Sequence, residues 1–203
     1  MDFVENARNT AGVFQKNTER LFAAAAHGRL DEARTFAPFC RQGAVNGQGE
    51  TPLMVAAQNG HGHMVRDLAL RCNPEAADHR GRTALMHAVL EDDGRGKGRG
   101  AGAGKSEAVD ALAKICNPNI QDNEGLNALM HAALRGDERS ADRLMGSTDL
   151  CAIDAKGRNA AACAKTPQLA AKIEKKAQEQ AVDRALAQPE KSLVAAQSKE
   201  KTF

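Results

Sequence analysis

The chain has 203 residues, and its 28 lysines and arginines nearly balance 26 aspartates and glutamates, for a formal net charge of +2. This balance argues against nucleic-acid binding through a global positive field, and the aromatic content of 3%, with no Trp or Tyr, argues against aromatic platforms for bases. The five cysteines form no C-x-x-C pair, and the amino terminus has no signal-peptide pattern, so we expect a cytoplasmic protein. The longest apolar run, residues 21–26, is too short to span a membrane.

The first predicted element covers residues 1–18. Phe3, Ala7, Ala11 and Phe14 recur there at helical spacing and give the segment one apolar face. Such a face needs a partner, so we expect residues 1–18 to form a helix that caps the next part of the chain.

From residue 19 onward the sequence repeats itself. Equivalent positions begin at Glu19, Thr51, Thr83, Asn127 and Asn159, at intervals of 32, 32, 44 and 32 residues. One insertion of 12 residues, the difference between 44 and 32, explains the longer interval. Within a unit the apolar residues have helical spacing, first in one helix and then in a second. Because one helix pair cannot bury its apolar face alone, we expect the units to stack.

The connections between units also follow the repeat. They contain Asn, Pro, Asp and Gly, as in NPEAADHRGR and NPNIQDNEGL, which is typical of turns. Each has a glycine three residues after an Asn or Asp. The Asn or Asp residues are Asn46, Asp78, Asp122 and Asp154.

These motifs resemble the ankyrin repeat family. The resemblance is carried by GETPLMVAAQNGHGHMVRDLA (49–69), GRTALMHAV (81–89), CNPNIQDNEGLNALMHAALRGD (116–137) and DAKGRNAAACA (154–164), and it covers about residues 19–165. It implies an all-α ankyrin-repeat solenoid of about five helix-turn-helix units with hairpin connections. Met54, Met86 and Met130 stand where the family usually has a histidine, so the resemblance implies that the hydrogen bond from that histidine to the neighbouring turn is lost.

The insertion contains GRGKGRGAGAGKSE, residues 94–107, and ends like a phosphate-binding loop. The motif G-x-x-x-x-G-K-[ST] requires a glycine at position 99, where the chain has Arg99, and the preceding residues have a helical rather than a strand pattern. We therefore expect a flexible Gly/Arg/Lys insertion at about 93–105, after which Ser106 begins a second helix. Binding of a nucleotide or nucleic acid through residues 94–107 is the alternative function.

The cysteines do not indicate a metal site or a disulfide. Cys40, Cys72 and Cys116 occupy one repeat position, so stacked helices would hold them about 10 Å apart. That separation is too large for a disulfide or for one shared zinc ion. We expect small buried residues there, and the same for Cys151 and Cys163; no cofactor or metal is expected.

The chain is predicted to end in a helix and a tail. Thr166 and Pro167 form a typical helix start, and the pattern continues to about Ala187. Residues 166–187 are therefore expected to form a C-terminal capping helix, and residues 188–203 a disordered tail.

The resemblance implies a monomeric, non-enzymatic protein–protein interaction module that acts as an adaptor or scaffold for another protein. Single histidines without a nearby nucleophile do not indicate catalysis. Partner contacts are expected at the hairpin tips and in the concave groove formed by the first helices. The tip residues are Gln48, Glu50, His79, Arg80, Arg82, Asn123, Glu124 and Leu126, and the groove residues are Asn59, His87, Glu91, His131 and Arg135.

Asn119 leaves a third possibility open. It occupies the hairpin position that asparagine hydroxylases modify in some ankyrin proteins, so the chain could be an enzyme substrate. The preceding unit has Glu75 at that position.

Overall fold

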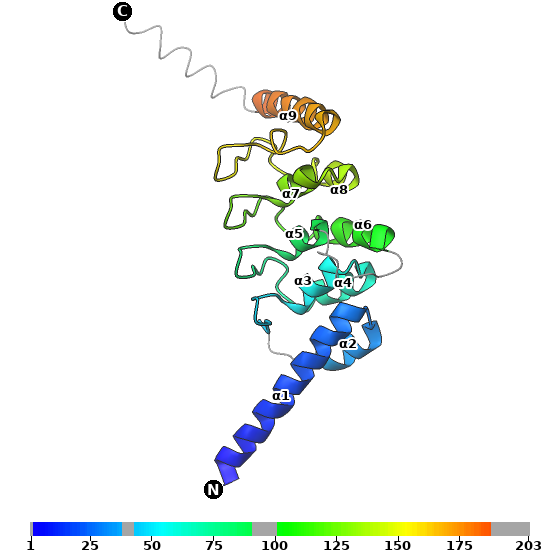
Figure 1. Cartoon of the computed structure of the whole chain (residues 1–203), viewed down its shortest axis with the longest axis vertical. Coiled ribbons are helices and arrows are strands. Elements are labelled where there is room, and N and C mark those ends of the chain that lie inside the picture. The colour runs from blue at the N-terminus through cyan, green and yellow to red at the C-terminus, as the bar shows by residue number, and fades with distance from the viewer. Residues whose placement is uncertain (1, 38–42, 91–100, 188–203) are drawn as a thin grey trace, which may run out of the picture.

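The structure is a computed structural model, and it describes residues 2–37, 43–90 and 101–187 (Figure 1). These residues contain nine helices and no strand. The all-helical prediction is confirmed. The helices are α1 (Asp2–His27), α2 (Leu30–Phe36), α3 (Pro52–Gln58), α4 (Gly62–Ala69), α5 (Ala84–Val89), α6 (Ala101–Leu112), α7 (Ala128–Arg135), α8 (Glu138–Leu144) and α9 (Pro167–Ala187).

The helices form antiparallel pairs that stack into an elongated body, with the hairpin connections along one side (Figure 1). Helix α3 packs against α5 and α5 against α7, while α4 packs against α6 and α6 against α8. The repeated leucine of each unit is central to this packing because it is almost completely shielded from solvent. These leucines are Leu21, Leu53, Leu85 and Leu129, each at most 2% exposed.

Two of the short first helices, α3 and α7, begin at side-chain caps, whereas Thr83 at the start of α5 makes no such hydrogen bond. The Thr51 hydroxyl accepts the Met54 N–H at 3.3 Å, and Pro52 occupies the first turn, where no N–H is needed. The Met54 sulfur in turn accepts the Thr51 N–H at 3.4 Å. At α7 the same position is Asn127, whose side chain accepts the Met130 N–H at 2.9 Å. Met54, Met86 and Met130 are all buried near the helix starts, and the Met54 side chain also helps to close its cap.

Helix α1 differs from the predicted N-terminal cap. One continuous helix runs through residue 18 into the first repeat, and its N-terminal part extends away from the stack (Figure 1). Leu21 and Ala24 are buried, whereas Val13 and Phe14 are 58% and 47% exposed. Only the C-terminal part of α1 packs in the stack, so Phe14 does not cover the first unit as we expected.

Helix α6 begins at Ala101, five residues before the predicted start at Ser106. It packs along α4, and Gly104 lies so close to the Gly60 carbonyl oxygen that a Cβ at residue 104 would overlap it. Residues 101–105 are therefore helical rather than part of a loop. The remainder of the expected insertion, residues 91–100, lies outside the described residues.

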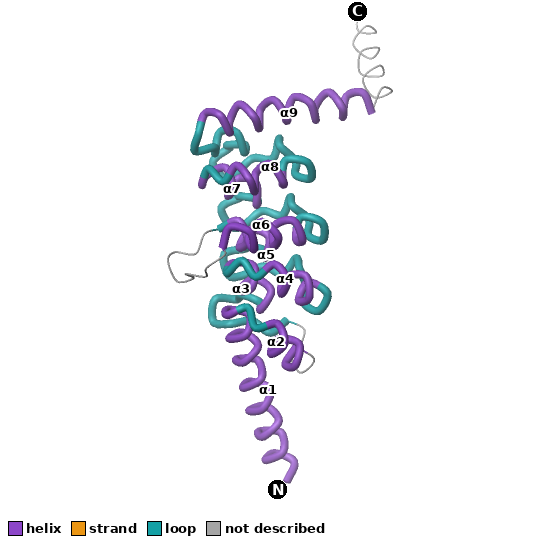
Figure 2. Tube along the Cα trace, turned by 90° about the vertical axis from the view of Figure 1, so that its right-hand side faces the viewer, coloured by secondary structure: helices purple, strands orange, loops and turns teal. Residues whose placement is uncertain are grey.

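The last unit is shorter than the sequence indicated. Residues 160–163 form a single turn instead of a helix, and the Lys165 N–H donates to the Ala133 carbonyl at 2.9 Å. Helix α9 follows and lies across the end of the stack (Figure 2). Its Leu169 and Ile173 are at most 1% exposed, so they cover the apolar surface of the last helix pair. The expected tail at 188–203 lies outside the described residues.

Four cysteines, Cys72, Cys116, Cys151 and Cys163, are free thiols. Cys116 is buried and donates to the Pro74 carbonyl, and burial, helped by the Glu75 carboxylate, raises the pKa of its thiol to about 11. Cys151 is exposed because it lies at the last connection, where no further unit covers it; the expected burial is wrong there. Cys40 lies outside the described residues.

Among the described residues, no helix combines the length and the apolar character needed to cross a bilayer.

Candidate functional site: the stacked hairpins

Each hairpin is shaped by one side chain that accepts two backbone N–H groups. We number each hairpin by the repeat unit that follows it. In the third hairpin, which leads into the unit that starts at Thr83, Asp78 Oδ1 accepts the N–H groups of Arg80 at 2.8 Å and Arg82 at 2.9 Å. Such local side-chain acceptors stabilise turns, because the backbone groups are satisfied without a neighbouring strand. The corresponding acceptors in the other hairpins are Asn46, Asp122 and Asp154.

Backbone hydrogen bonds also connect successive hairpins. In each case the N–H of one hairpin tip donates to a carbonyl oxygen of the preceding tip. The donor–acceptor pairs are His79–Gln48 at 3.1 Å, Asn123–Arg80 at 3.0 Å and Ala155–Glu124 at 3.0 Å. The tips therefore form a regular ladder along one side of the stack (Figure 1).

Behind the third hairpin lies a buried polar network. Asp78 Oδ2 lies 2.8 Å from Arg82 Nη2 and 3.0 Å from His87 Nε2. Burial works against ionisation of Asp78, but the N–H donors of Arg82, Arg80 and His87 hold its pKa below its usual value. Because an ionised carboxylate can only accept, His87 must carry its proton on Nε2. Burial and the Arg82 charge lower the pKa of His87.

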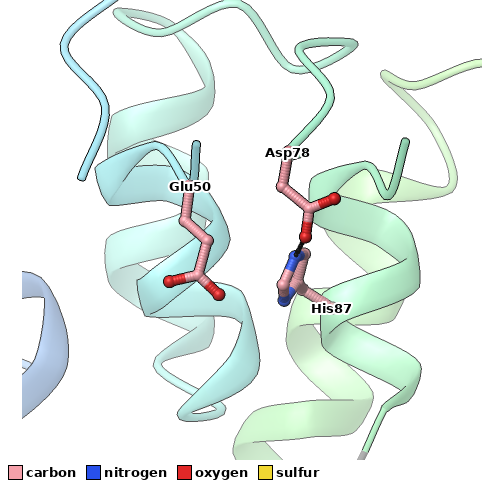
Figure 3. Close-up of side chains that lie close together, drawn as sticks. All are labelled: Glu50, Asp78 and His87. Atoms are coloured by element: carbon pink, nitrogen blue, oxygen red, sulfur yellow. Dashed lines mark hydrogen bonds and ion pairs between the residues drawn. The ribbon is translucent and has the colours of Figure 1, made fainter. Parts of the chain in front are cut away.

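Glu50 of the preceding unit lies beside this network (Figure 3). One ligand atom of each of Glu50, Asp78 and His87 lies within 4.8 Å of the others, which is the spacing a divalent cation could use. However, Asp78 Oδ2 already accepts hydrogen bonds from Arg82 and His87, and the guanidinium supplies positive charge. The chemistry of the donors fits an internal hydrogen-bonded network better than a cation site.

The fourth and last hairpins repeat the network with different partners. Asp122 Oδ2 accepts from His131 Nε2 at 2.8 Å, while Leu126 replaces the arginine of the third hairpin. In the last hairpin, Arg158 Nη2 lies 2.7 Å from Asp154 Oδ2. The N–H groups and the guanidinium of Arg158 hold the pKa of Asp154 below its usual value.

The structure divides the predicted partner-binding residues into three groups. Gln48, His79, Arg80, Asn123 and Glu124 are exposed at the tips. Asn59, Arg82 and Arg135 are half-buried. Glu50, His87, Leu126 and His131 are buried. Glu91 lies outside the described residues.

The four buried residues correct the prediction. His87 and His131 were expected to line an exposed groove, but they are 1% and 9% exposed, and each donates to the aspartate of its own hairpin. Leu126 is 5% exposed and belongs to the hydrophobic core, while Glu50 is 7% exposed and accepts from the Asn46 side chain. Their side chains hold the hairpins on the helices instead of facing a partner.

The third possibility, Asn119, occupies a position that links units. Its Oδ1 accepts the Asp149 N–H at 2.7 Å, and Glu75 does the same for the Asn117 N–H at 3.3 Å in the preceding layer. Both side chains therefore contribute to the stacking of hairpins.

One exposed tip residue was missed. Lys156 lies in the last hairpin at the position of Gln48, Arg80 and Glu124 in the others, and its N–H is held by Asp154 in the same way. The recurring pattern of an aspartate three residues before a glycine, which includes Asp154, could have identified it.

The segment that ends like a phosphate loop has a different geometry. Gly104, Lys105 and Ser106 lie within α6, after its first turn has begun at Ala101. Phosphate loops use free backbone N–H groups that converge at a helix start. Since Gly104 is pressed against the Gly60 carbonyl, the space that a phosphate would need is occupied by protein backbone.

A family model described as ankyrin repeats (3 copies) matches residues 19–95. No curated protein matched the chain. The matched region includes the first three predicted repeat starts, and the paired helices beyond it continue the same stack. The helix pairs, the hairpin connections and the family match agree, and the chain therefore carries ankyrin repeats at residues 19–95.

Proposed function

We propose that this protein is a cytoplasmic adaptor or scaffold that binds another protein through its hairpin tips and the adjoining helix ends. Ankyrin repeats are generally protein-binding and typically non-catalytic. The observation that supports the proposal most directly is the ladder of tips, in which each backbone is fixed by an Asp or Asn side chain and by the preceding hairpin.

A fixed backbone favours binding because little conformational entropy is lost when a partner docks. Exposed side chains on such a backbone present the same contacts before and after association. The tip residues proposed to contact the partner are Gln48, His79, Arg80, Asn123 and Glu124. Asn59 and Arg135, at the ends of α3 and α7, would extend the contact surface.

Affinity capture with paired variants tests the proposal. The tip variant combines Gln48→Ala, Arg80→Ala and Glu124→Ala, whose side chains are exposed. The control variant combines Glu174→Ala, Lys175→Ala and Gln178→Ala on the exposed face of α9 and removes the same kinds of groups. We expect proteins captured by the wild type and the control to be lost from the tip variant. Equal capture by all three would contradict a partner site at the tips.

A further inference from the structure

We propose that Ser106 is a phosphorylation site whose phosphate is held by Arg139 and Arg143 of the next unit. The inference goes beyond the proposed partner binding at the hairpin tips and does not depend on it. It follows from the contact between α6 and α8, the second helices of two successive units (Figure 1). At this contact an arginine faces a hydroxyl group instead of a carboxylate.

Ion pairs connect the second helices of successive units. Each pair joins a basic side chain of one unit to a carboxylate of its neighbour. The pairs are Arg34–Asp67 between α2 and α4, Arg66–Glu107 between α4 and α6, Arg143–Asp110 between α8 and α6, and Lys172–Asp142 between α9 and α8. An acidic side chain is therefore the usual partner of a basic one where these helices meet.

The register of α6 and α8 places Ser106 opposite Arg139. Because the two are equivalent helices of successive units, they run in the same direction. Residues four apart lie one above the other on a helix. The ion pair of Asp110 with Arg143 therefore determines which residues meet one turn earlier, and these are Ser106 and Arg139.

An open pocket lies at this point, lined by Ser106, Arg139, Asp142 and Arg143. In the described part of the chain Arg139 is exposed and forms no ion pair. Arg143 uses Nε for Asp110 and Nη1 for a backbone carbonyl, so its Nη2 group remains available as a donor. The Asp142 carboxylate accepts from the ammonium group of α9 at 2.7 Å, which offsets its repulsion of an anion. The pocket thus offers two guanidinium groups beside one hydroxyl group.

Phosphorylation would supply the missing anion. A protein kinase would transfer the γ-phosphoryl group of ATP. A bond forms between Ser106 Oγ and the γ-phosphorus, the bond from that phosphorus to the β,γ-bridging oxygen breaks, the hydroxyl proton passes to a base of the kinase, and ADP leaves. The product carries about 1.5 to 2 negative charges at pH 7 and three acceptor oxygens, which guanidinium groups bind through charge-assisted hydrogen bonds. The phosphate would join α6 to α8.

This site is distinct from the phosphate loop that the sequence suggested. Gly104 and Glu107 face α4, where the Gly60 carbonyl and the Arg66 side chain occupy the space. Ser106 lines the pocket on the α8 side of the helix instead. The close packing that excludes a phosphate from the first side therefore does not obstruct the second.

A kinase needs access to the half-buried serine. The five residues of α6 before Ser106 are Ala-Gly-Ala-Gly-Lys, and glycine is the least favourable residue in a helix after proline. This turn therefore opens at a lower cost than the rest of α6 and can expose Ser106 to the kinase.

The titration of the phosphate reports the contact directly. Phosphoserine is incorporated at position 106 of the full chain by amber suppression and followed by ³¹P NMR. Because the guanidinium groups favour the dianion, we expect the second pKa of the phosphate, about 6 in an unfolded chain, to be lower by about one unit in the folded chain. The same protein unfolded in urea provides the reference.

Matched variants identify the groups that hold the phosphate. Arg139→Gln, at an exposed side chain without an ion pair in the described residues, should reverse most of the shift. Arg80→Gln removes the same charge at a hairpin tip and should leave the shift unchanged. The phosphorylated chain should also unfold at a higher urea concentration than the unmodified chain, and Arg139→Gln should abolish that difference.

Two further measurements identify the source of the phosphate. Mass spectrometry of the protein isolated from its native cells should find Ser106 phosphorylated. Titration of the unmodified full chain with inorganic phosphate should leave the amide resonances of α6 and α8 in place. Binding of inorganic phosphate that Arg139→Gln abolishes would identify a site for a diffusible phosphate and would overturn the modification.

The remaining contrary results are equally clear. A phosphate pKa that is the same in the folded and unfolded chains, or unaffected by Arg139→Gln, would mean that the arginines do not hold the phosphate. An unmodified Ser106 in the native protein would overturn the inference as well. Neither result affects the proposed binding at the hairpin tips, which the capture experiment tests separately.

Discussion

The third and fourth hairpins have the same backbone but different networks behind it. Asp78 and Asp122 each use Oδ1 to accept two N–H groups of the turn. Their Oδ2 atoms differ, because Asp78 binds both Arg82 and His87, whereas Asp122 binds only His131. The turn therefore depends on one carboxylate oxygen, and the second oxygen is satisfied by whichever donors the local sequence provides.

The largest effect that we expect is a loss of unfolding free energy when Asp78 or Asp122 is replaced by alanine, and the loss should differ between the two hairpins. Asp78→Ala leaves two N–H groups, Arg82 and the fully buried His87 without their acceptor, and we expect a loss of about 3 kcal/mol. Asp122→Ala leaves no arginine unpaired and should cost about 2 kcal/mol. Urea unfolding followed by circular dichroism measures both. An equal or larger loss for Asp122→Ala would mean that the Arg82 contact adds nothing to the third hairpin.

The turn glycines differ in how closely the following hairpin packs against them. Gly81, Gly125 and Gly157 share a φ of 75–77°, so alanine at any of them has a left-handed backbone, which costs about 1 kcal/mol. A Cβ at Gly125 would lie 2.6 Å from the Ala155 backbone nitrogen, a Cβ at Gly81 2.6 Å from the Asn123 side-chain oxygen, and a Cβ at Gly157 would meet open space.

The order of the three alanine variants follows from these contacts. Gly125→Ala should be the most destabilised, at about 2 kcal/mol, because a backbone atom cannot move aside as a side chain can. Gly81→Ala should be intermediate, and Gly157→Ala should show only the conformational cost of about 1 kcal/mol. Thermal unfolding of the three variants gives the order, and equal losses would show that close packing of the hairpins does not contribute.

A smaller effect concerns the pH dependence of stability in the third unit. Since the pKa of His87 is held below 6.5 in the folded chain, the unfolded chain takes up a proton first as the pH falls. Stability is therefore lost as the pH falls from about 6.5 through the lower pKa of His87 in the folded chain. The carboxyl group of Asp78 titrates only at lower pH, because its pKa is held below the ordinary value of 3.8. His87→Gln should lose less stability than the wild type between about pH 7 and about pH 5. Parallel losses in urea titrations would show that His87 does not contribute.

The smallest effect is on the pKa of His87 itself. The Arg82 charge lowers this pKa, so Arg82→Leu, which reproduces the leucine of the fourth hairpin, should raise it. NMR titration of the His87 ring protons measures the change. An unchanged or lower pKa in the variant would indicate that burial alone controls the third network.

Much of the repeat architecture could be predicted because its signals are local and recurrent. The apolar spacing and the turn residues recur in one register, and the structure has helix pairs and hairpins in that register from α1 to α8. The exposed tips Arg80 and Glu124 followed from their place beside a turn glycine. The side chains of His87 and His131 could not be placed in this way, because their burial depends on where the hairpin folds back over the helix.

The repeat period and the residues that form the turns follow from the sequence alone, because both recur at a fixed spacing along the chain. The tertiary structure decided where α6 begins, because a glycine-containing segment has little intrinsic preference for a helix and gains stability here from its close packing on α4. The tertiary structure also determines which charged side chains of the hairpins are paired inside the protein and which remain exposed to solvent. Arg80 and Arg82 are two residues apart and both donate a backbone N–H to Asp78, but only the Arg82 guanidinium forms an ion pair with its carboxylate, and that pairing exists only in the folded hairpin.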